Sequence, residues 1–205
     1  MKIKLFLFIV LIFNLTNIPK IHAQLKYSEK RNTSQQQTTS GATRGCRTNL
    51  PKMQLLAPSE QIVEIGESQI FLLNINQISP YPIKISVLEP NNPKSLWSKE
   101  LRPTQSGLQK IILPTTLNLK PYQDYILTAT IYCDQNNPSN NAYIRVFFRK
   151  TTPSLSINSL DSSPQQQVSS LLQQGLWYDA LWVAYYHHLP QFKQILKQEN
   201  IELED

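Results

Sequence analysis

Glycine and histidine are scarce in this sequence of 205 residues, which holds five glycines and three histidines. Scattered glycines exclude a glycine-rich phosphate-binding loop, and the motifs G-x-S-x-G, H-E-x-x-H, C-x-x-C and G-x-x-x-x-G-K are absent. His187 and His188 are neighbours in the chain, so they would lie about 100° apart on a helix and could not bind one metal from the same stripe. We therefore predict a protein that is not an enzyme, with no catalytic residues, no cofactor and no metal site.

Long apolar stretches are also missing: after the N-terminus none approaches 18 residues, so we expect no membrane span in the mature chain. The N-terminus itself combines basic Lys2 and Lys4, an apolar run from Leu5 to Phe13, and a small residue at Ala23. This is the layout of a secretory signal peptide, and its apolar run is too short to span a bilayer. An uncleaved anchor is the alternative. We predict a signal peptide over residues 1–23 and a periplasmic or extracellular location.

The excess of positive charge is smaller than the formal value of +6 suggests. Lys2, Lys4 and Lys20 would leave with the signal peptide, so 17 basic and 14 acidic side chains would remain, and the net charge would fall to +3. A charge this small does not support a nucleic-acid partner.

Residues 24–45 are polar and contain almost no large apolar side chain. Such a segment cannot bury enough surface to offset the entropy of ordering its backbone. We interpret it as a disordered polar linker.

Short apolar runs separated by turn residues follow within residues 46–152. Their spacing and length are typical of a β-sandwich or barrel. Tyr125, Leu127, Ala129 and Ile131 alternate with polar residues, which indicates a strand with one buried face. The runs are Ile70–Ile75, Ile83–Leu88, Leu96–Leu101, Leu108–Leu113, Tyr125–Cys133 and Tyr143–Phe148.

The stretch from Leu119 to Tyr125 resembles the strand entry of fibronectin type III domains, L-x-P-x-x-x-Y. In those domains the tyrosine hydroxyl bonds back to the backbone of the corner. The resemblance implies an all-β immunoglobulin-like or fibronectin-like sandwich, with Tyr125 buried and its hydroxyl bonded to the backbone between Leu119 and Tyr122.

The periodicity becomes helical beyond a second linker at residues 153–163. Ser163, Pro164 and Gln166 have the spacing of an N-cap, a first helical residue and a capping-box partner, and Gly175 lies where a C-cap would. Residues 164–205 are therefore predicted to form a small C-terminal α-helical module of two to three helices. It is too small to bury a core alone, so it docks on the sandwich or on a partner. Its apolar stripes are Val168, Leu171 and Leu172; Trp177, Ala180, Leu181 and Ala184; and Phe192, Ile195 and Leu196.

Aromatic residues crowd the second of these helices. Trp177 and Leu181 lie on its core stripe, whereas Trp182, Tyr178 and Tyr185 lie partly off that stripe. A surplus of aromatic side chains is typical of an interaction hot spot, so these three are the candidate interaction residues. The alternative is that a wide helix face packs on the sandwich.

Cys46 and Cys133 are the two cysteines of the chain. An even number in an exported protein predicts a disulfide, here joining the start of the sandwich to the end of a central strand. Two free thiols or a metal-binding pair are the alternatives.

Three elements together resemble a cyanobacterial family of exported proteins catalogued as a domain of unknown function, number nine-two-eight. They are Gly45-Cys46-Arg47, Ile131-Tyr132-Cys133-Asp134 and Gly175-Leu176-Trp177-Tyr178-Asp179-Ala180-Leu181. The resemblance implies export but supplies no activity. The third element is also similar to the first helix of tetratricopeptide repeats, which suggests helix-pair packing and protein binding.

We therefore expect a disulfide-stapled protein-interaction module of the bacterial envelope, with another envelope or extracellular protein as partner. The alternative is a carbohydrate-binding or carbohydrate-active protein without a recognisable motif. Carbohydrate binding would use exposed Trp97, Tyr122 or Tyr143.

Overall fold

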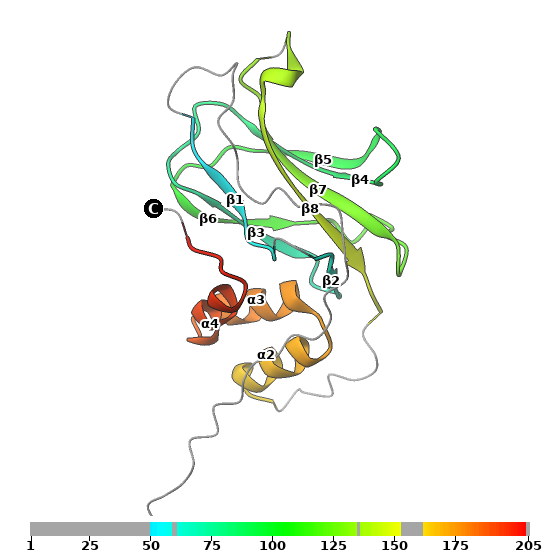
Figure 1. The fold of residues 1–205 in the computed structure, drawn as a ribbon, viewed down its shortest axis with the longest axis vertical. Coiled ribbons are helices and arrows are strands. Elements are labelled where there is room, and N and C mark those ends of the chain that lie inside the picture. Colours follow the sequence, from blue (N-terminus) through cyan, green and yellow to red (C-terminus); the bar gives the residue numbers. More distant parts are fainter. Residues whose placement is uncertain (1–49, 59–60, 135, 153–161, 204–205) are drawn as a thin grey trace, which may run out of the picture.

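A computed structural model describes residues 50–58, 61–134, 136–152 and 162–203 (Figure 1). The predicted signal peptide, the linker at 24–45, Cys46 and most of the second linker lie outside the described residues. Among the described residues, none of the helices combines the length and the hydropathy that a membrane span requires.

Eight strands form two sheets. One sheet has the strand order β1-β3-β6 and is antiparallel, and the other has the order β2-β8-β7-β4-β5. The second sheet is antiparallel except for its parallel β2–β8 pair. The strands are β1 (Met53–Leu55), β2 (Val63–Ile65), β3 (Ile70–Ile75), β4 (Ile83–Leu88), β5 (Ser95–Leu101), β6 (Gly107–Ile112), β7 (Asp124–Ile131) and β8 (Ala142–Lys150), with a short 3-10 helix, η1 (Pro138–Asn140), before β8.

All six predicted strands are present, with ends within two residues of the expected positions. β1 and β2 were not predicted, because each has three residues and so is too short to show a period of two. These short strands matter to the architecture, since β1 extends the smaller sheet and β2 adds the parallel edge beside β8.

The core lies between the two sheets. Along β7 every second side chain from Tyr125 to Ile131 is buried, as the alternation predicted. The rings of Phe71 in the smaller sheet and Phe148 in the larger one meet edge to face, with centroids 5.1 Å apart. Such a contact joins the inner faces of both sheets through one apolar layer.

The predicted bond at the entry to β7 is confirmed. Tyr125 is 2% exposed, and its hydroxyl accepts a 2.8 Å hydrogen bond from the backbone N–H of Lys120. Tyr122 lies in the same corner and has a left-handed φ of 61°. Its N–H donates a 2.7 Å hydrogen bond to the carbonyl of Lys150. The corner is therefore tied both to its own tyrosine and to the end of β8.

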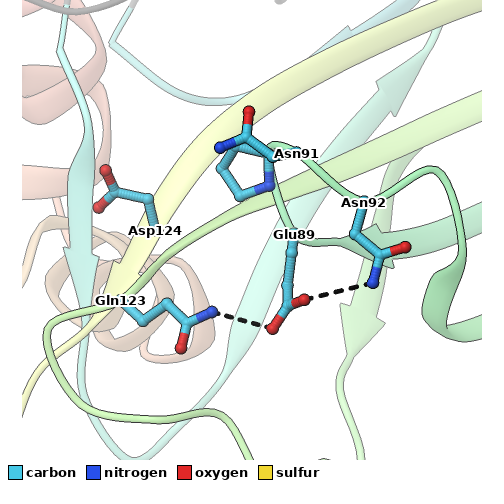
Figure 2. Close-up of a pocket in the computed structure, with 6 residues that line it drawn as sticks. Glu89, Asn91, Asn92, Gln123 and Asp124 are labelled. Atoms are coloured by element: carbon cyan, nitrogen blue, oxygen red, sulfur yellow. Dashed lines mark hydrogen bonds between the residues drawn. The ribbon is translucent and has the colours of Figure 1, made fainter.

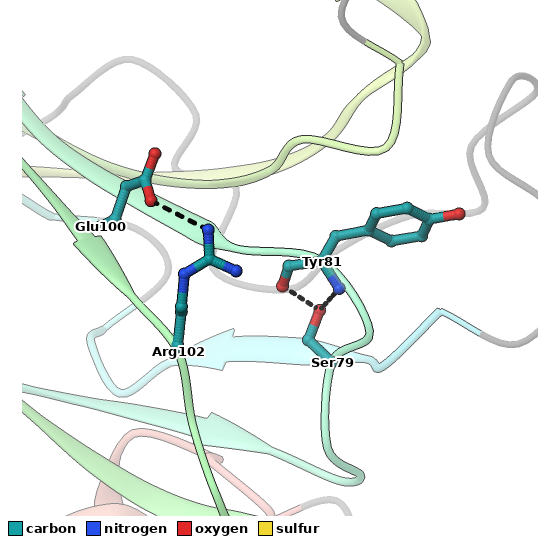
Figure 3. Close-up of polar contacts among 4 residues, drawn as sticks. All are labelled: Ser79, Tyr81, Glu100 and Arg102. Carbon is teal, nitrogen blue, oxygen red and sulfur yellow. Dashed lines mark hydrogen bonds and ion pairs between the residues drawn. The ribbon is translucent and has the colours of Figure 1, made fainter.

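At the opposite end of the larger sheet, the β3–β4 connection is closed by a local turn (Figure 3). The Ser79 hydroxyl donates to the carbonyl of Tyr81 at 2.7 Å and accepts from the Tyr81 N–H at 3.2 Å. Nearby, Arg102 lies 3.3 Å from Glu100, and both side chains are exposed. Because exposed ion pairs are screened by solvent, this pair contributes little to stability.

Three helices follow: α2 (Pro164–Gln173), α3 (Trp177–Tyr186) and α4 (Gln191–Gln198). The capping box of Ser163 and Gln166 forms as predicted, with Pro164 at the first helical position. Gly175 has a φ of +79°, the left-handed conformation that ends a helix at low steric cost. The N- and C-terminal signals of α2 are thus both confirmed.

The helical module covers one end of the two sheets, with α3 against β2 and β3 and with α2 and α4 packed on α3 (Figure 1). Buried side chains of the helices and of both sheets belong to one continuous core. Of the two docking possibilities that the sequence left open, the structure shows docking on the module's own chain. The described part is mostly β-sheet, with three C-terminal helices.

Candidate functional site

A buried carboxylate anchors α3 to the sheets. Asp179 lies in the first turn of α3 and is 7% exposed. It accepts hydrogen bonds from the Gly66 N–H at 2.7 Å, the Ser68 N–H at 3.2 Å and the Ser68 hydroxyl at 2.6 Å. Three donors from the β2–β3 turn offset the cost of burying the charge. The acid is therefore committed to docking the helix.

The aromatic side chains beside this anchor are core. Trp177 and Leu181 are each 1% exposed, as predicted. The prediction for Tyr178 is wrong: this candidate interaction residue is 2% exposed, and its ring lies 4.5 Å from that of Phe71. The reason is that α3 is covered from more than one direction, by α2 and α4 and by β2 and β3. Tyr178 lies about 100° around the helix from Trp177, and that face of α3 is covered by protein as well.

The other two candidates, Trp182 and Tyr185, remain partly exposed. Their rings are 6.1 Å apart, and they join Tyr186 and Phe192 in one chain of contacts. The ring centroids of Trp182 and Tyr186 are 5.4 Å apart, and so are those of Tyr185 and Phe192. Trp182, Tyr185, Tyr186 and Phe192 are called the aromatic surface below.

A lysine from the smaller sheet completes this surface. The Lys110 ammonium lies 4.8 Å from the centroid of the Trp182 ring, within the range of a cation–π interaction. Lys110 belongs to β6, which is an edge strand of its sheet. Ile112, two residues further along the same face of β6, is 51% exposed. The aromatic surface therefore continues onto an apolar and cationic edge.

Tyr186 and Phe192 were not predicted as members of the aromatic surface, and Lys110 was not predicted as its neighbour. Tyr186 carried a usable signal, because it follows Trp182 by four residues and so lies on the same helix face. It is 62% exposed, the most exposed aromatic ring of the module. Lys110 carried no such signal, since only the tertiary fold brings β6 beside α3.

A polar pocket lies between the β4–β5 turn and the start of β7 (Figure 2). It has a volume of about 410 Å³ and is lined by six residues. All except the proline carry an amide or a carboxylate: Glu89, Pro90, Asn91, Asn92, Gln123 and Asp124.

The three aromatics expected to bind carbohydrate do not form one surface. Trp97 and Tyr143 lie on β5 and β8, which are separated by β7 and β4, a distance of about 14 Å across the sheet. The strand register places Trp97 on the inner face with Val87, whereas Tyr143 lies on the outer face. Tyr122 is 66% exposed at the β7 corner, with its hydroxyl 3.0 Å from that of Thr152.

Cys133 follows β7, and no free cysteine occurs among the described residues. Cys46 lies outside them, so the predicted pairing with Cys46 stays a prediction.

Asp134, the residue after Cys133, accepts hydrogen bonds from the Asn140 side chain and from the backbone N–H groups of Asn137 and Asn136. These donors, the Asn140 amide foremost, lower the pKa of the Asp134 carboxyl below its ordinary value near 3.8. Within the described residues, no group of three or more His, Cys, Asp or Glu side chains could hold a metal ion.

Comparison with known proteins gives a family and no activity. No curated protein matches the chain. A crystal structure of an engineered protein is similar over 49% of this chain, with 8% identity and a TM-score of 0.31, and this chain spans 20% of that protein. That likeness is too low to carry any argument. A family described as a domain of unknown function, DUF928, matches residues 39–200, which is most of the chain. The chain therefore belongs to the DUF928 family.

Proposed function

We propose that this protein is an exported, non-enzymatic protein-interaction module of the bacterial envelope, and that its aromatic surface binds another envelope or extracellular protein. The observation that carries the proposal is the connected set of partly exposed rings around Trp182. Tryptophan and tyrosine dominate the energetics of protein interfaces because they bury large areas and retain a polar group.

The docking of α3 supports this role. Asp179 bonds to the β2–β3 turn, and Trp177 and Tyr178 of the same helix are buried in the core. A helix held in this way presents Trp182 and Tyr185 in fixed positions before a partner arrives. Binding would then cost less conformational entropy than it would from a mobile segment.

Finer features belong to the same proposal. We infer export from the signal-peptide layout of residues 1–23, a cyanobacterial source from the family resemblance, and a Cys46–Cys133 staple from the two cysteines. We further infer an immunoglobulin-like or fibronectin-like variant of the sandwich, which the Tyr125 corner supports.

The test is capture of partners from the native envelope with the tagged full-length protein, followed by affinity measurement with the partner identified. Trp182→Ala should weaken binding by about 2–4 kcal/mol, which is about 30- to 1000-fold, and should cost less folding stability than Trp177→Ala, because Trp182 is only partly buried. Tyr143→Ala is the matched control, because Tyr143 is a 47% exposed aromatic on β8, away from the helices.

Two further variants separate binding from folding. Trp177→Ala and Tyr178→Ala should each cost about 3–5 kcal/mol of folding stability, since both side chains are buried. If Trp182→Ala captures every partner as well as the unmodified protein does, the aromatic surface is not the binding site. The proposal fails in the same way if Tyr143→Ala produces the larger loss.

A further inference from the structure

The polar pocket is built on a rigid turn. The chain Glu89-Pro90-Asn91-Asn92-Pro93 places Pro90 at the second position of a β-turn, where its fixed φ is favoured, and the Asn92 N–H donates to the Glu89 carbonyl at 3.1 Å. The Asn92 side chain in turn accepts from the Lys94 N–H at 3.0 Å. Two prolines and these bonds reduce the number of conformations open to the turn.

Side-chain bonds connect this turn to β7 (Figure 2). One Glu89 carboxylate oxygen accepts from the Gln123 amide at 2.9 Å, and the other accepts from the Asn92 amide at 3.4 Å. Asp124 is paired with Arg149, whose Nε and Nη2 each lie 2.6 Å from its Oδ1. Glu89, Gln123 and Asp124 are thus oriented in advance, which lowers the cost of binding a ligand.

Several polar atoms still have capacity for a ligand. Asn91 has no hydrogen-bond partner among the described residues, and the Gln123 carbonyl and the Asp124 Oδ2 accept none there. A carboxylate offers about four lone-pair sites, so Glu89 can accept further hydrogen bonds. The pocket therefore offers both amide donors and carbonyl or carboxylate acceptors.

The charge of the lining restricts the ligand class. No Lys or Arg lines the pocket, which disfavours an anion, and Pro90 is its only apolar lining residue, which disfavours an apolar ligand. Arg149 already neutralises Asp124, and both Glu89 oxygens accept amide bonds, which disfavours a bare metal ion. Hydroxyl groups suit this lining because each one donates and accepts at the same time.

From this geometry we propose that the pocket between the β4–β5 turn and the start of β7 binds a neutral sugar ring. Vicinal hydroxyls of the ring bond to Glu89, Asn91 and Gln123, with Pro90 against an apolar face of the ring. The pocket has a volume of about 410 Å³ and is open to solvent, so the ring would lie against its lining with one face exposed. This site is independent of the aromatic surface and of the function proposed for it.

The test is an NMR titration of the mature, isotope-labelled protein with methyl glucoside, methyl mannoside and methyl galactoside. At least one of them should shift the amide signals of residues 89–92 and 123–124 saturably, with a Kd on the order of 1 mM. Asn91→Ala and Gln123→Ala should each weaken binding at least about fivefold, which corresponds to one lost hydrogen bond. Asn91→Ala should fold normally, because its side chain bonds to no described residue.

Gln105→Ala is the matched control: it removes an exposed amide side chain from the β5–β6 connection and should leave the affinity unchanged. Trp182→Ala should also leave it unchanged, so failure here is distinguishable from failure of the interaction proposal. Linear, unsaturable shifts with all three sugars would overturn the proposal. The proposal would also be overturned if Asn91→Ala and Gln123→Ala both bound the sugar as tightly as the unmodified protein does. Loss of binding on adding EDTA would overturn it too, and so would tighter binding of methyl glucuronide than of the neutral sugars.

Discussion

The Asp179 carboxylate on α3 accepts a 2.7 Å hydrogen bond from the backbone N–H of Gly66, which precedes it by 113 residues. This bond joins the helical module to the turn between β2 and β3. Asp179 lies in the G-x-W-Y-D-A-L element that carried the family resemblance, between buried Tyr178 and buried Ala180. In the described structure this element therefore serves to dock α3.

Removing the carboxylate should destabilise the whole protein. Asp179→Ala leaves two N–H groups and one hydroxyl of the β2–β3 turn without their acceptor, at a cost of about 3 kcal/mol in the free energy of unfolding. Ser68→Ala, which removes only the hydroxyl donor, should cost about 1 kcal/mol. Urea unfolding measures both changes. If Asp179→Ala lowered the free energy of unfolding by less than Ser68→Ala does, the carboxylate would not be the anchor of the helical module.

Gly66 should be coupled to Asp179 by close approach. A Cβ at position 66 would lie 3.3 Å from the Asp179 Oδ1, so Gly66→Ala should cost about 1 kcal/mol as the carboxylate is displaced. In the Asp179→Ala background that contact is gone, and the same change should cost nothing. A double-mutant cycle from urea unfolding should therefore give a coupling of about 1 kcal/mol, whereas additive effects would contradict this account.

The Tyr125 corner should contribute through its hydroxyl. Tyr125→Phe removes the acceptor of the Lys120 N–H and should lower the free energy of unfolding by about 1 kcal/mol. Tyr122→Phe is a matched control, because the hydroxyl bond that it removes is exposed. Thermal or chemical unfolding of both variants should show a measurable loss for the first and a change of less than about 0.5 kcal/mol for the second.

The predicted disulfide should be visible in the exported protein. The mature chain should migrate faster on a non-reducing gel than on a reducing gel, and Cys46→Ser or Cys133→Ser should abolish that difference and lower the melting temperature. The chain-entropy model gives about 4–5 kcal/mol as the upper value of the stabilisation from a disulfide that closes the loop between Cys46 and Cys133. Detection of two titratable thiols in the native exported protein would contradict the bridge.

Asp134 should make the segment around η1 sensitive to acid. Its folded pKa lies below the ordinary value near 3.8, so the carboxylate stabilises the fold above that value, and the contribution is lost as the pH falls through the folded pKa. Amide exchange of Asn136 and Asn137, whose N–H groups donate to Asp134, should accelerate over that range relative to other amides. Asp134→Ala should remove this pH dependence. A carboxyl titration of Asp134 at or above its ordinary value would contradict it.

Local sequence signals predicted the elements well where they are long or carry a cap. The six longer strands, the capping box of Ser163 and the glycine end of α2 follow from side-chain period and from hydrogen bonds between near neighbours. The three-residue strands β1 and β2 were not predicted, because they form by pairing with strands far away in the chain and not from a pattern in their own sequence. Trp182 and Tyr185, which lie partly off the core stripe, are partly exposed, whereas Tyr178 is buried.

The sequence by itself determined the family, the strand and helix pattern, the Tyr125 corner and the buried stripe of Trp177 and Leu181. Only the tertiary structure decided that the helical module docks on its own sheets, that Tyr178 belongs to the core, and that Lys110 lies over Trp182. It also assembled the polar pocket from Glu89 and Gln123, which are 34 residues apart. The physical reason is that period and capping depend on neighbours within a few residues. Which faces of a helix are covered, by contrast, depends on contacts between segments far apart in the chain.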